Sequence, residues 1–582
     1  MQRYICHDCD DLECNSEICP ICGGHTASIN TEIYWCPECN APSFSQICTK
    51  CHNHCSYLAS DLRPVFPEER LLLEVLLGKP MKYAGSSVWS SGSGTYFING
   101  NKIKLNYAQA MKNDPIEIRS LLEKYSKENR WYIDHFFESE NIRAAININR
   151  EHINEIQDEA LSFIRSKTAD ISLSSMFVSF SGGKDSTVIS NLAIDALGSE
   201  NVLHIYGDTT LEYPDSELYL KRFRLDHKKT PILVARNRDQ NFIDLCNKIG
   251  PPSRVLRWCC TVFKTGAINR LIETMFTGKS KVIAFHGIRR VESISRSKYE
   301  RVSESPKITK QIVIQPILDW MNFDVWMYII TKHLDFNDAY RKGFSRVGCW
   351  CCPNNSAWAG YLASIYMPEQ SANFTNVLYD FAKSVNKPDW KEYIDSGSWK
   401  ARQGGNGLEY SKNAVIDFKP CAFEENAYNF ELSKPISEDL YTLFKPFGII
   451  DRTIGNPRLG EVYILNRSNS MPLMRITGKV GQNKLKVSVL NYIGPFSVKS
   501  RIESYIKAQI TKYQTCIGCS ACASVCKHSA IKVENTNPGD VSVNSIKYEI
   551  DDKKCVGCLD CILHFDSGCY MKKVLRVKNE VL

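Results

Sequence analysis

The stretch FVSFSGGKDSTV, from Phe177 to Val188, decides the fold of the central part of the chain. Its mostly apolar start predicts a buried strand, Gly182 and Gly183 break that strand, and the residues that follow predict a helix. Glycine permits positive φ and lets backbone N–H groups approach an anion. The helix adds unpaired N–H groups and the positive end of its dipole, so the pattern predicts a phosphate-binding loop.

The side chains of this loop add groups that suit a nucleotide. Lys184 supplies a positive charge, and Ser181 and Ser186 supply hydroxyl donors. Asp185 would repel a phosphate unless it faces a metal ion or orients the loop, so the loop suits a nucleotide bound with magnesium. The stretch is not a Walker A loop, which requires Gly-x-x-x-x-Gly-Lys-Ser/Thr.

The sequence around the loop alternates between strand and helix patterns. The predicted strands are MFVSF, VLHIYGD, PILVAR and KVIAFHGI, and the predicted helices are DSTVISNLAIDAL and GAINRLIETMF. This alternation predicts an α/β fold with a mostly parallel sheet. TYFINGNKIKL predicts a hairpin that turns at Asn99-Gly100. GEVYILNR, LMRITGKV and LKVSVLNYIG predict the strands of a small β-rich unit.

The loop SGGKDS resembles the PP-loop of ATP pyrophosphatases, which cleave ATP between its α and β phosphates. Over about residues 160–370, further blocks resemble the phosphoadenosine phosphosulfate (PAPS) reductase branch: GDTTLEYPDSELYL, RWCCTVFKTGAINRLI, GIRRVESISR, QPILDWMNFDVWMYI and YRKGFSRVGCWCCP. True sulfonucleotide reductases have a degenerate loop and end in a Glu-Cys-Gly-Leu/Ile-His motif. This chain has an intact loop and no such ending. It therefore most resembles, in character, the ATP pyrophosphatases of DNA phosphorothioation.

The resemblance implies roles for individual residues. The nucleotide-binding residues would be Ser181, Gly182, Gly183, Lys184, Asp185 and Ser186. The catalytic residues would be Lys184, Asp185, Asp208, Arg289, Arg290 and Arg296. Asp185 and Asp208 would position magnesium, and the arginines would clamp a phosphate or an oxyanion, which their forked guanidinium groups suit.

The 25 cysteines form three groups, with ten before residue 56, seven between Cys246 and Cys421, and eight after residue 515. Many form pairs with two residues between the cysteines, and the chain has no apparent export signal or membrane span. We therefore expect a cytoplasmic protein whose cysteines bind metal and iron–sulfur clusters rather than form disulfides.

The first group predicts two tetrahedral zinc ribbons, because its paired knuckles have the spacing of zinc ligands. The two ligand sets are Cys6, Cys9, Cys19 and Cys22, and Cys36, Cys39, Cys48 and Cys51. Cys14 and Cys55 are left over, and His25 or His52 could replace a thiol. The ribbons serve either as structural staples or as docking sites for nucleic acid or a partner.

The last group has the spacing of a two-cluster ferredoxin, in which the fourth cysteine of each run binds the other cluster. The two predicted 4Fe-4S sets are Cys516, Cys519, Cys522 and Cys569, and Cys555, Cys558, Cys561 and Cys526. Lys527 stands where proline is usual, and a longer gap precedes Cys569. One cluster, or zinc, is the alternative.

The middle group resembles the Cys-Cys and Cys-x-x-Cys ligands of the 4Fe-4S cluster in adenylylsulfate reductases. The residues that match are Cys259, Cys260, Cys349 and Cys352. Cys351 competes with Cys352 as the ligand. Iron, zinc, or a role as small hydrophobic side chains are all open for this site.

The length of 582 residues requires several domains. We expect zinc ribbons at 1–56, a connecting region at 57–165, a PP-loop domain at 166–400, a β-rich accessory domain at 401–505, and a ferredoxin domain at 506–582. The formal net charge of +8 permits a polyanionic partner without requiring one.

We hypothesise that the chain adenylylates an acceptor with ATP, releases pyrophosphate, and assists sulfur transfer through its iron–sulfur clusters, most plausibly in DNA phosphorothioation. The expected partners are ATP with magnesium, a sulfur donor such as a cysteine desulfurase, an electron donor, and nucleic acid, DNA more than tRNA. The alternatives are a PAPS or adenylylsulfate reductase, a tRNA thiolase, and a non-enzymatic, redox-regulated nucleic-acid-binding module.

Overall fold

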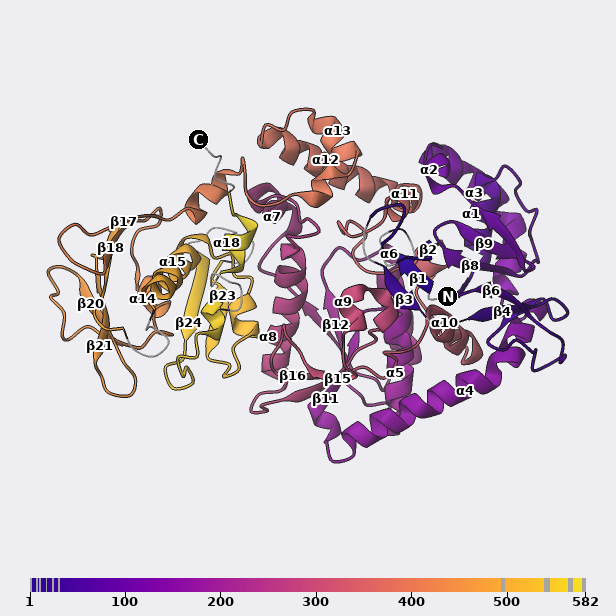
Figure 1. Ribbon diagram of the computed structural model, residues 1–582, viewed down its shortest axis with the longest axis horizontal. Helices are drawn as coiled ribbons and strands as arrows, with labels where there is room; N and C mark the ends of the chain where they lie inside the picture. Colours follow the sequence, from indigo (N-terminus) through magenta and orange to yellow (C-terminus); the bar gives the residue numbers. More distant parts are fainter. Residues whose placement is uncertain are drawn as a thin grey trace. The chain divides into compact units, whose positions relative to one another are not determined.

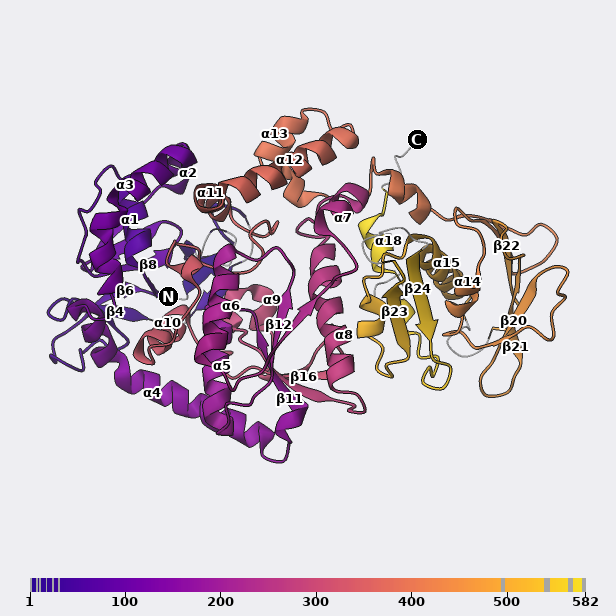
Figure 2. The same ribbon diagram turned by 180° about the vertical axis from the view of Figure 1, so that it is seen from behind.

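The computed structural model describes residues 3–6, 9, 12–16, 18–23, 26–29, 32–492, 498–537, 545–563 and 569–577. The chain divides into two compact units, both drawn in Figures 1 and 2. The first unit contains residues 1–234, 279–304 and 311–372. The second unit contains residues 235–278, 305–310 and 373–582.

The first unit is built around a six-stranded sheet in the order β13-β12-β11-β14-β16-β15. Its strands are β11 (Met176–Phe180), β12 (His204–Asp208), β13 (Ile232–Arg236), β14 (Val282–Phe285), β15 (Val302–Glu304) and β16 (Gln311–Ile314). β11 pairs in parallel with β12 and β14, β14 pairs in parallel with β16, and β15 is an antiparallel edge. The predicted strands and the mostly parallel sheet are confirmed. The strand order reverses between β11 and β14, which is where open α/β sheets bind ligands.

The helix predicted after the glycines is α5 (Lys184–Leu197), which packs against β11. Its inner side is fully buried at Val188, Ile189 and Leu192. The long helix α4 (Glu140–Thr168) contacts both α5 and α10 (Asn322–Thr331) and is visible along the lower side of Figure 1. Because α5 buries this inner side against the sheet, the start of the helix is fixed at the end of β11.

The predicted hairpin is formed by β9 (Thr95–Ile98) and β10 (Asn101–Lys104), paired antiparallel. Asn99 and Gly100 have φ of +48° and +79°, as a two-residue type I′ turn requires. A Cβ on Gly100 would lie 2.4 Å from the indole nitrogen of Trp35, so the position also needs glycine for space.

The remaining part of the first unit contains three small antiparallel sheets, β2-β1-β3, β5-β4-β6 and β10-β9-β8-β7, with short helices. The elements are β1 (Arg3–Cys6), β2 (Leu12–Cys14), β3 (Ala27–Ile29), β4 (Ile33–Cys36), β5 (Ala41–Ser43), β6 (Ser56–Ala59), β7 (Arg63–Pro64), α1 (Pro67–Leu76), β8 (Val88–Gly92), α2 (Tyr107–Ala110), α3 (Pro115–Asp134), η2 (Leu173–Ser175), α6 (Pro214–Asp226), η4 (Arg290–Glu292), α9 (Ile294–Ser297), η5 (Asp338–Tyr340) and α11 (Ala357–Tyr366).

The second unit contains an antiparallel sheet in the order β17-β18-β22-β21-β20-β19. Its strands are β17 (Asp417–Pro420), β18 (Ala427–Glu431), β19 (Ile449–Asp451), β20 (Glu461–Leu465), β21 (Pro472–Thr477) and β22 (Lys484–Val489). The three strands predicted for a β-rich unit are therefore confirmed as β20, β21 and β22.

The other elements of the second unit are mainly helical. They are α7 (Phe242–Ile249), the π-helix η3 (Cys260–Thr265), α8 (Gly266–Met275), most of α12 (Pro368–Ser384), α13 (Trp390–Asp395), η6 (Ser398–Ala401), η7 (Glu409–Ala414), α14 (Glu438–Thr442), α15 (Lys499–Thr515), α16 (Ala521–Ser524), the hairpin of β23 (Ile531–Asn535) and β24 (Ile546–Ile550), α17 (Asp560–Leu563) and α18 (Tyr570–Val574).

Helix α15 is a feature that the sequence analysis did not anticipate, and the expected boundary between residues 505 and 506 falls inside it. The helix contacts α14, α17 and α18, and it shares a hydrophobic core with the antiparallel sheet and the β23–β24 hairpin. Burial of α15 therefore joins the β-rich part and the cysteine-rich part of the second unit. Within the described residues, none of the helices has the length and apolar character needed to cross a bilayer.

Candidate nucleotide site and metal centres

The predicted phosphate loop, Ser181–Ser186, connects β11 to α5. Gly182 has φ of +71°, a conformation that residues with a side chain adopt only with strain. The Ser186 hydroxyl donates to the Gly183 carbonyl at 2.8 Å and accepts from the Ser181 hydroxyl at 3.2 Å. These bonds fold the loop tightly at the carboxyl end of β11.

The start of α5 presents its backbone amides at the loop. The first helical hydrogen bond runs from the Thr187 amide to the Gly183 carbonyl at 3.0 Å, so the amides of Lys184, Asp185 and Ser186 have no partner within the helix. The positive end of the helix dipole therefore lies at the loop, as expected for an anion-binding site.

A buried ion-pair triad lies at this helix start. The Asp185 carboxylate accepts from Lys184 Nζ at 3.0 Å and from Arg289 Nε at 2.7 Å. Lys184, Asp185 and Arg289 are 6%, 15% and 5% exposed. Arg289 follows β14, so the triad joins the two sides of the strand reversal. These contacts favour an orienting role for Asp185, and its contact with magnesium stays a prediction.

The charges of the triad set the ionisation of its members. Burial raises the pKa of Asp185, but the charges of Arg289 and Lys184 outweigh burial and lower the pKa to about 2. Burial lowers the pKa of Lys184, and Asp185 partly offsets this effect. While Lys184 is protonated, two cations face one carboxylate, and the excess positive charge favours an anion beside the loop.

The other two predicted arginines are more exposed than Arg289. Arg290 pairs with Asp319, Arg296 pairs with Glu292, and the two arginine side chains are 40% and 39% exposed. Burial and the charge of Arg346 lower the pKa of Arg296. Arg290 and Arg296 are therefore each held by a carboxylate, and both lie in the chain segment that follows Arg289.

Asp208 ends β12, the strand beside the phosphate-loop strand. Its Oδ1 accepts from the Thr210 amide at 2.8 Å. The neighbouring Glu212 carboxylate accepts from the Thr209 hydroxyl at 2.7 Å, and that hydroxyl lies 3.3 Å from Cys349 Sγ. Asp208 thus lies at the carboxyl edge of the sheet, where a magnesium ligand is expected.

Sequence reasoning did not single out three residues that hold the loop in place. The Tyr340 hydroxyl accepts from the Lys184 amide at 3.1 Å, and the Asn337 side-chain amide donates to the Gly182 carbonyl at 3.3 Å. A Cβ on Gly287 would approach the Asp185 carbonyl oxygen at 2.7 Å. Tyr340 begins the block YRKGFSRVGCWCCP, so the signal for it was present.

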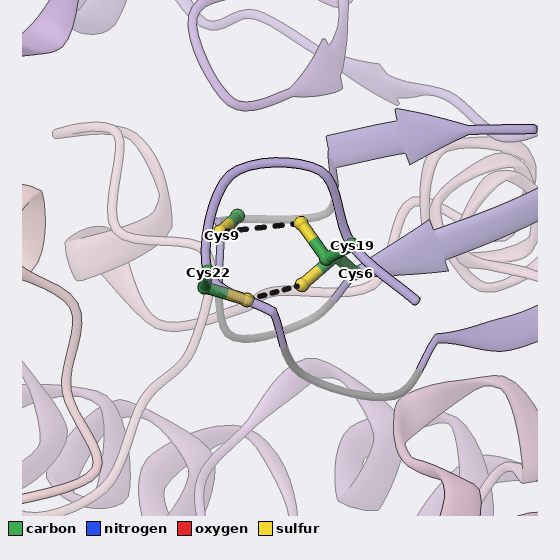
Figure 3. A group of neighbouring side chains, drawn as sticks. All are labelled: Cys6, Cys9, Cys19 and Cys22. Atoms are coloured by element: carbon green, nitrogen blue, oxygen red, sulfur yellow. Dashed lines mark hydrogen bonds between the residues drawn. The ribbon is translucent and has the colours of Figure 1, made fainter. Parts of the chain in front are cut away.

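The two predicted zinc sets each bring four thiols together. Within each set, all four sulfurs lie within 4.8 Å of one another, and Figure 3 shows the side chains of the first set close together. The sets are Cys6, Cys9, Cys19 and Cys22, and Cys36, Cys39, Cys48 and Cys51. The sulfur atoms lie 3.4, 3.7, 3.4 and 3.8 Å apart in the pairs Cys6–Cys22, Cys9–Cys19, Cys36–Cys51 and Cys39–Cys48.

This geometry fits tetrahedral zinc, because four Zn–S bonds of about 2.3 Å place the sulfurs roughly 3.8 Å apart. The third cysteine of each set also has a lowered pKa, which favours the thiolate form that binds metal. Burial raises the pKa of Cys19 and Cys48, but hydrogen bonds from nearby backbone amides and thiols lower it to about 7. Among the alternative ligands, His25 lies outside the described residues.

The first tail set lies in the second unit, but among the described residues only the two zinc sets have all their ligand atoms within 4.8 Å of one another. Burial raises the pKa of Cys516 to about 12, with further increases from the nearby Cys569 and Cys522. Burial also raises the pKa of Cys519, as do Cys516, Cys522 and Cys569. These four residues are close enough to influence one another, as ligands of one cluster must be.

The second tail set lines a single cavity. Its four cysteines line this cavity together with residues such as Ile531, Ile550 and His528. The set is Cys526, Cys555, Cys558 and Cys561. Cys558 is exposed, whereas Cys561 is buried, so one side of this set faces solvent. The arrangement fits the crossed ligand pattern of a two-cluster ferredoxin.

Comparison with known families agrees with this geometry. Residues 175–355 match the family model "Phosphoadenosine phosphosulfate reductase domain". These residues are therefore similar to a PAPS reductase domain, and we refer to this matched segment as the reductase domain. Residues 515–564 match the model "4Fe-4S dicluster domain". The predicted resemblance to the PAPS reductase family, the multi-domain α/β fold and the iron–sulfur character of the protein are confirmed.

Several known proteins are similar to part of this chain. An uncharacterised protein of Methanocaldococcus jannaschii is 31% identical over 255 residues, covering 44% of this chain and 51% of the relative. A second from the same organism is 33% identical over 247 residues, covering 42% and 55%. The chain thus spans about half the length of these relatives. The adenosine 5'-phosphosulfate reductase of Neisseria meningitidis serogroup B is 34% identical over 101 residues, covering 16% of this chain and 36% of the relative.

Among solved structures, the phosphate complex of PAPS reductase from Candida auris matches with a TM-score of 0.27 and 15% identity. It covers 35% of this chain and 96% of that chain. FMN adenylyltransferase of Candida glabrata, solved with FAD and pyrophosphate, matches with a TM-score of 0.28 and 14% identity, covering 34% and 62%.

Cys259 and Cys260 of the reductase domain lie in the second unit, at the start of the π-helix. A hydrogen bond with Cys259 lowers the pKa of Cys260 to about 6, assisted against burial by the charges of Arg257 and Lys264. A thiolate at neutral pH is the form that binds metal.

Cys349 and Cys352 of the reductase domain lie in the first unit. The Cys352 amide donates to the Cys349 carbonyl at 3.2 Å in a tight turn that Asn355 also bonds. Cys351, the competing ligand, is 8% exposed. A cluster shared by the two cysteine pairs stays a prediction.

Within the second unit, the first tail set adjoins the π-helix segment. A Cβ on Gly266 would lie 2.6 Å from the Cys519 carbonyl oxygen, and Arg270 Nη1 donates to the Ser520 hydroxyl at 3.0 Å. Helix α16 also contacts the π-helix. The segment after Cys260 therefore packs directly on the residues that would hold one tail cluster.

A buried cation accompanies the two tail sets. Lys512 on α15 is 3% exposed, and its Nζ donates to the Cys561 carbonyl at 3.3 Å. Burial lowers the pKa of Lys512, but Cys522, Cys561 and Cys569 outweigh burial and raise it. These cysteines belong to both sets, so the charge of Lys512 acts on both.

The first prediction concerns metal content. Anaerobically purified protein is expected to bind about two zinc ions and eight to twelve iron atoms, at four iron atoms per cluster. The higher value requires a cluster at the reductase-domain cysteines, and Cys349→Ser should then lower iron by about four. Elemental analysis measures this. Cys421→Ser, outside every predicted set, is the control. Lost zinc with unchanged iron would make the site a zinc site.

The second prediction concerns Lys512. Lys512→Met is expected to shift the reduction potential of the tail clusters to a more negative value, because a nearby cation stabilises the reduced, more negative cluster. A redox titration followed by electron paramagnetic resonance measures the shift. Lys532→Met, at an exposed lysine of the β23–β24 hairpin, is the control and should leave the potential unchanged. An unaltered potential in Lys512→Met would contradict this role.

Proposed function

We propose that the protein activates an acceptor by ATP-dependent adenylylation, with release of pyrophosphate, and that sulfur then replaces the adenylate. The observation that carries this proposal is the intact Ser-Gly-Gly-Lys-Asp-Ser loop, held by the buried triad of Lys184, Asp185 and Arg289. A loop that had lost its nucleotide would have no need to keep two cations buried beside it, because burying charge is costly.

In the first step, an acceptor oxygen attacks the α phosphorus of ATP. A new P–O bond joins adenylate to the acceptor, the bond to the β phosphate breaks, and pyrophosphate leaves with that electron pair. Lys184 and the amides at the start of α5 would hold the β and γ phosphates. Asp185 would orient Arg289 toward the leaving group, and Asp208 would help to position magnesium. Such reactions depend on alignment and charge neutralisation more than on covalent catalysis.

In the second step, sulfide attacks the activated acceptor and AMP leaves. A persulfide donor yields that sulfide when two electrons and two protons convert it to a thiol and hydrogen sulfide. The clusters of the tail would supply low-potential electrons for this reduction. The exposed Cys558 gives an external electron donor access to the tail. At the first tail set, the close approach of Gly266 to the Cys519 carbonyl would bring that cluster near the Cys259–Cys260 segment.

The acceptor that we favour is a backbone phosphate of DNA. The intact loop favours phosphorothioation over sulfonucleotide reduction, and the net charge of +8 suits a polyanion. In the first unit, β3 of the first zinc ribbon contacts η4, the segment Arg290–Glu292. A ribbon in that position could guide a nucleic acid toward these arginines.

A second candidate function is adenylylsulfate reduction, which the similarity to the adenosine 5'-phosphosulfate reductase of Neisseria meningitidis favours. That reaction would yield sulfite and AMP from adenylylsulfate, without ATP and without pyrophosphate. Incubation of the reduced protein with adenylylsulfate, followed by a sulfite assay, separates the two candidates.

The third prediction tests the loop. Purified protein with ATP, magnesium and a DNA strand as the acceptor is expected to release pyrophosphate rather than orthophosphate, measured by phosphate assay with and without a pyrophosphatase. Lys184→Ala and Asp185→Ala should each lower turnover about 100-fold, because each disrupts charge stabilisation at the phosphates. Iron content should stay intact. Lys281→Ala, at a surface pair with Glu304, serves as the control. Equal turnover in the loop variants would refute the assignment.

The fourth prediction tests the coupling to electrons. Wild-type protein without a reductant is expected to release pyrophosphate but not to transfer sulfur, because only release of sulfide from a persulfide consumes electrons. Radiolabelled sulfur counted in the acceptor measures transfer. Cys519→Ser, checked for folding by circular dichroism, should fail to transfer sulfur even with reductant. Transfer at the wild-type rate by this folded variant would defeat the coupling.

A further inference from the structure

The β-rich sheet of the second unit carries an open groove that none of the functions above assigns. The groove has a volume of about 430 Å³. Its charged lining consists of Lys419, Arg458, Lys479, Lys484 and Lys486, with Asp417 and Glu431. Five cations thus face two carboxylates, which makes the groove a positively charged surface within a chain of mixed charge.

Strand register explains why these side chains share one face. Lys419 on β17 lies opposite Asn429 on β18, which lies opposite Lys486 on β22. Lys484 is two residues from Lys486 and therefore on the same face, about 7 Å along the strand. The residues that alternate with these along the strands are apolar. Phe430 and Leu485 belong to the hydrophobic core of the unit, and Phe418 packs against it. The basic row is thus fixed on the outer face by the same pleat that buries the apolar row.

Most of these cations lack a carboxylate partner in the protein. Lys486 pairs with Glu424 at 2.8 Å. Over the described part of the chain, Lys419, Arg458, Lys479 and Lys484 form no ion pair within 4.0 Å, and all four are exposed. Exposed lysines are often paired elsewhere in this unit, as Lys532 and Lys547 are with neighbouring glutamates. Lys484 lies opposite Glu431 in the strand register, so Lys419, Arg458 and Lys479 are the cations of the groove best placed to bind an external anion.

We propose that this groove binds the sugar–phosphate backbone of DNA and so holds the acceptor strand for the reaction. The proposal deepens the proposed function and rests on it for the choice of DNA as the acceptor. Cations from two strands and two loops match repeated phosphates better than one small anion. Exposed Leu459, which also lines the groove, offers an apolar contact for a base or sugar.

Fluorescence anisotropy with a labelled 20-nucleotide DNA strand tests the proposal. The triple variant Lys419→Glu, Lys479→Glu, Lys484→Glu is expected to bind at least 10-fold more weakly than wild type. The dependence of log affinity on log salt should flatten by about 2, since each lost phosphate contact removes about 0.7. The control is Lys532→Glu, Lys547→Glu, Lys554→Glu, with the same charge change on the tail hairpin and surface. Circular dichroism and iron content verify folding of both.

Several outcomes would overturn the proposal. These are wild-type protein that does not bind DNA, a triple variant that binds like the control, tighter binding of an RNA strand of the same sequence, and equal competition by polyglutamate. Pyrophosphate release is measured on the same wild-type preparation. Release without DNA binding would defeat both the groove and DNA as the acceptor and leave ATP-dependent activation standing, whereas binding without release would defeat the proposed function and leave the groove standing.

Discussion

The buried contact of Asp185 with Lys184 and Arg289 is the interaction on which the reductase domain depends. It ties the first turn of α5 to the segment after β14, and so closes the point where the strand order reverses. A buried carboxylate is tolerable only with both cations present, because desolvation otherwise favours its neutral form. Gly287 allows the two segments to approach, since a side chain there would collide with the Asp185 backbone. The loop is thereby held in shape before any nucleotide arrives.

Local pattern was sufficient for much of this architecture. The apolar run before Gly182 and the turn at Asn99-Gly100 each encode their structure within a few residues, so the strand, helix and hairpin could be predicted. The four-thiol knuckles could be predicted for the same reason, because their ligand spacing is local. The Arg296–Glu292 pair spans four residues and was within reach of local reasoning, whereas the Arg290–Asp319 pair was not, since its residues become partners only through folding.

The parts that sequence reasoning missed depend on contacts between distant residues. Tyr340 and Asn337 lie more than 150 residues from the loop they hold, and no short pattern marks that relation. Helix α15 has polar residues such as Gln509 and Lys512 in buried positions, which hides its amphipathic character. Lys512 is buried because thiol groups and a carbonyl surround it, and that environment exists only after the tail has folded.

The close approach of Gly266 to the Cys519 carbonyl also bears on how such a chain could have been assembled. Ferredoxin segments are often pictured as cassettes that recombination attaches to an enzyme. Here the enzyme side of the junction is a helix start with no room for a methyl group, and Arg270 reaches the neighbouring Ser520. A newly attached cassette would meet a surface already shaped for one partner. A ferredoxin segment taken from another protein would therefore fit here only if its backbone left the same space beside Gly266.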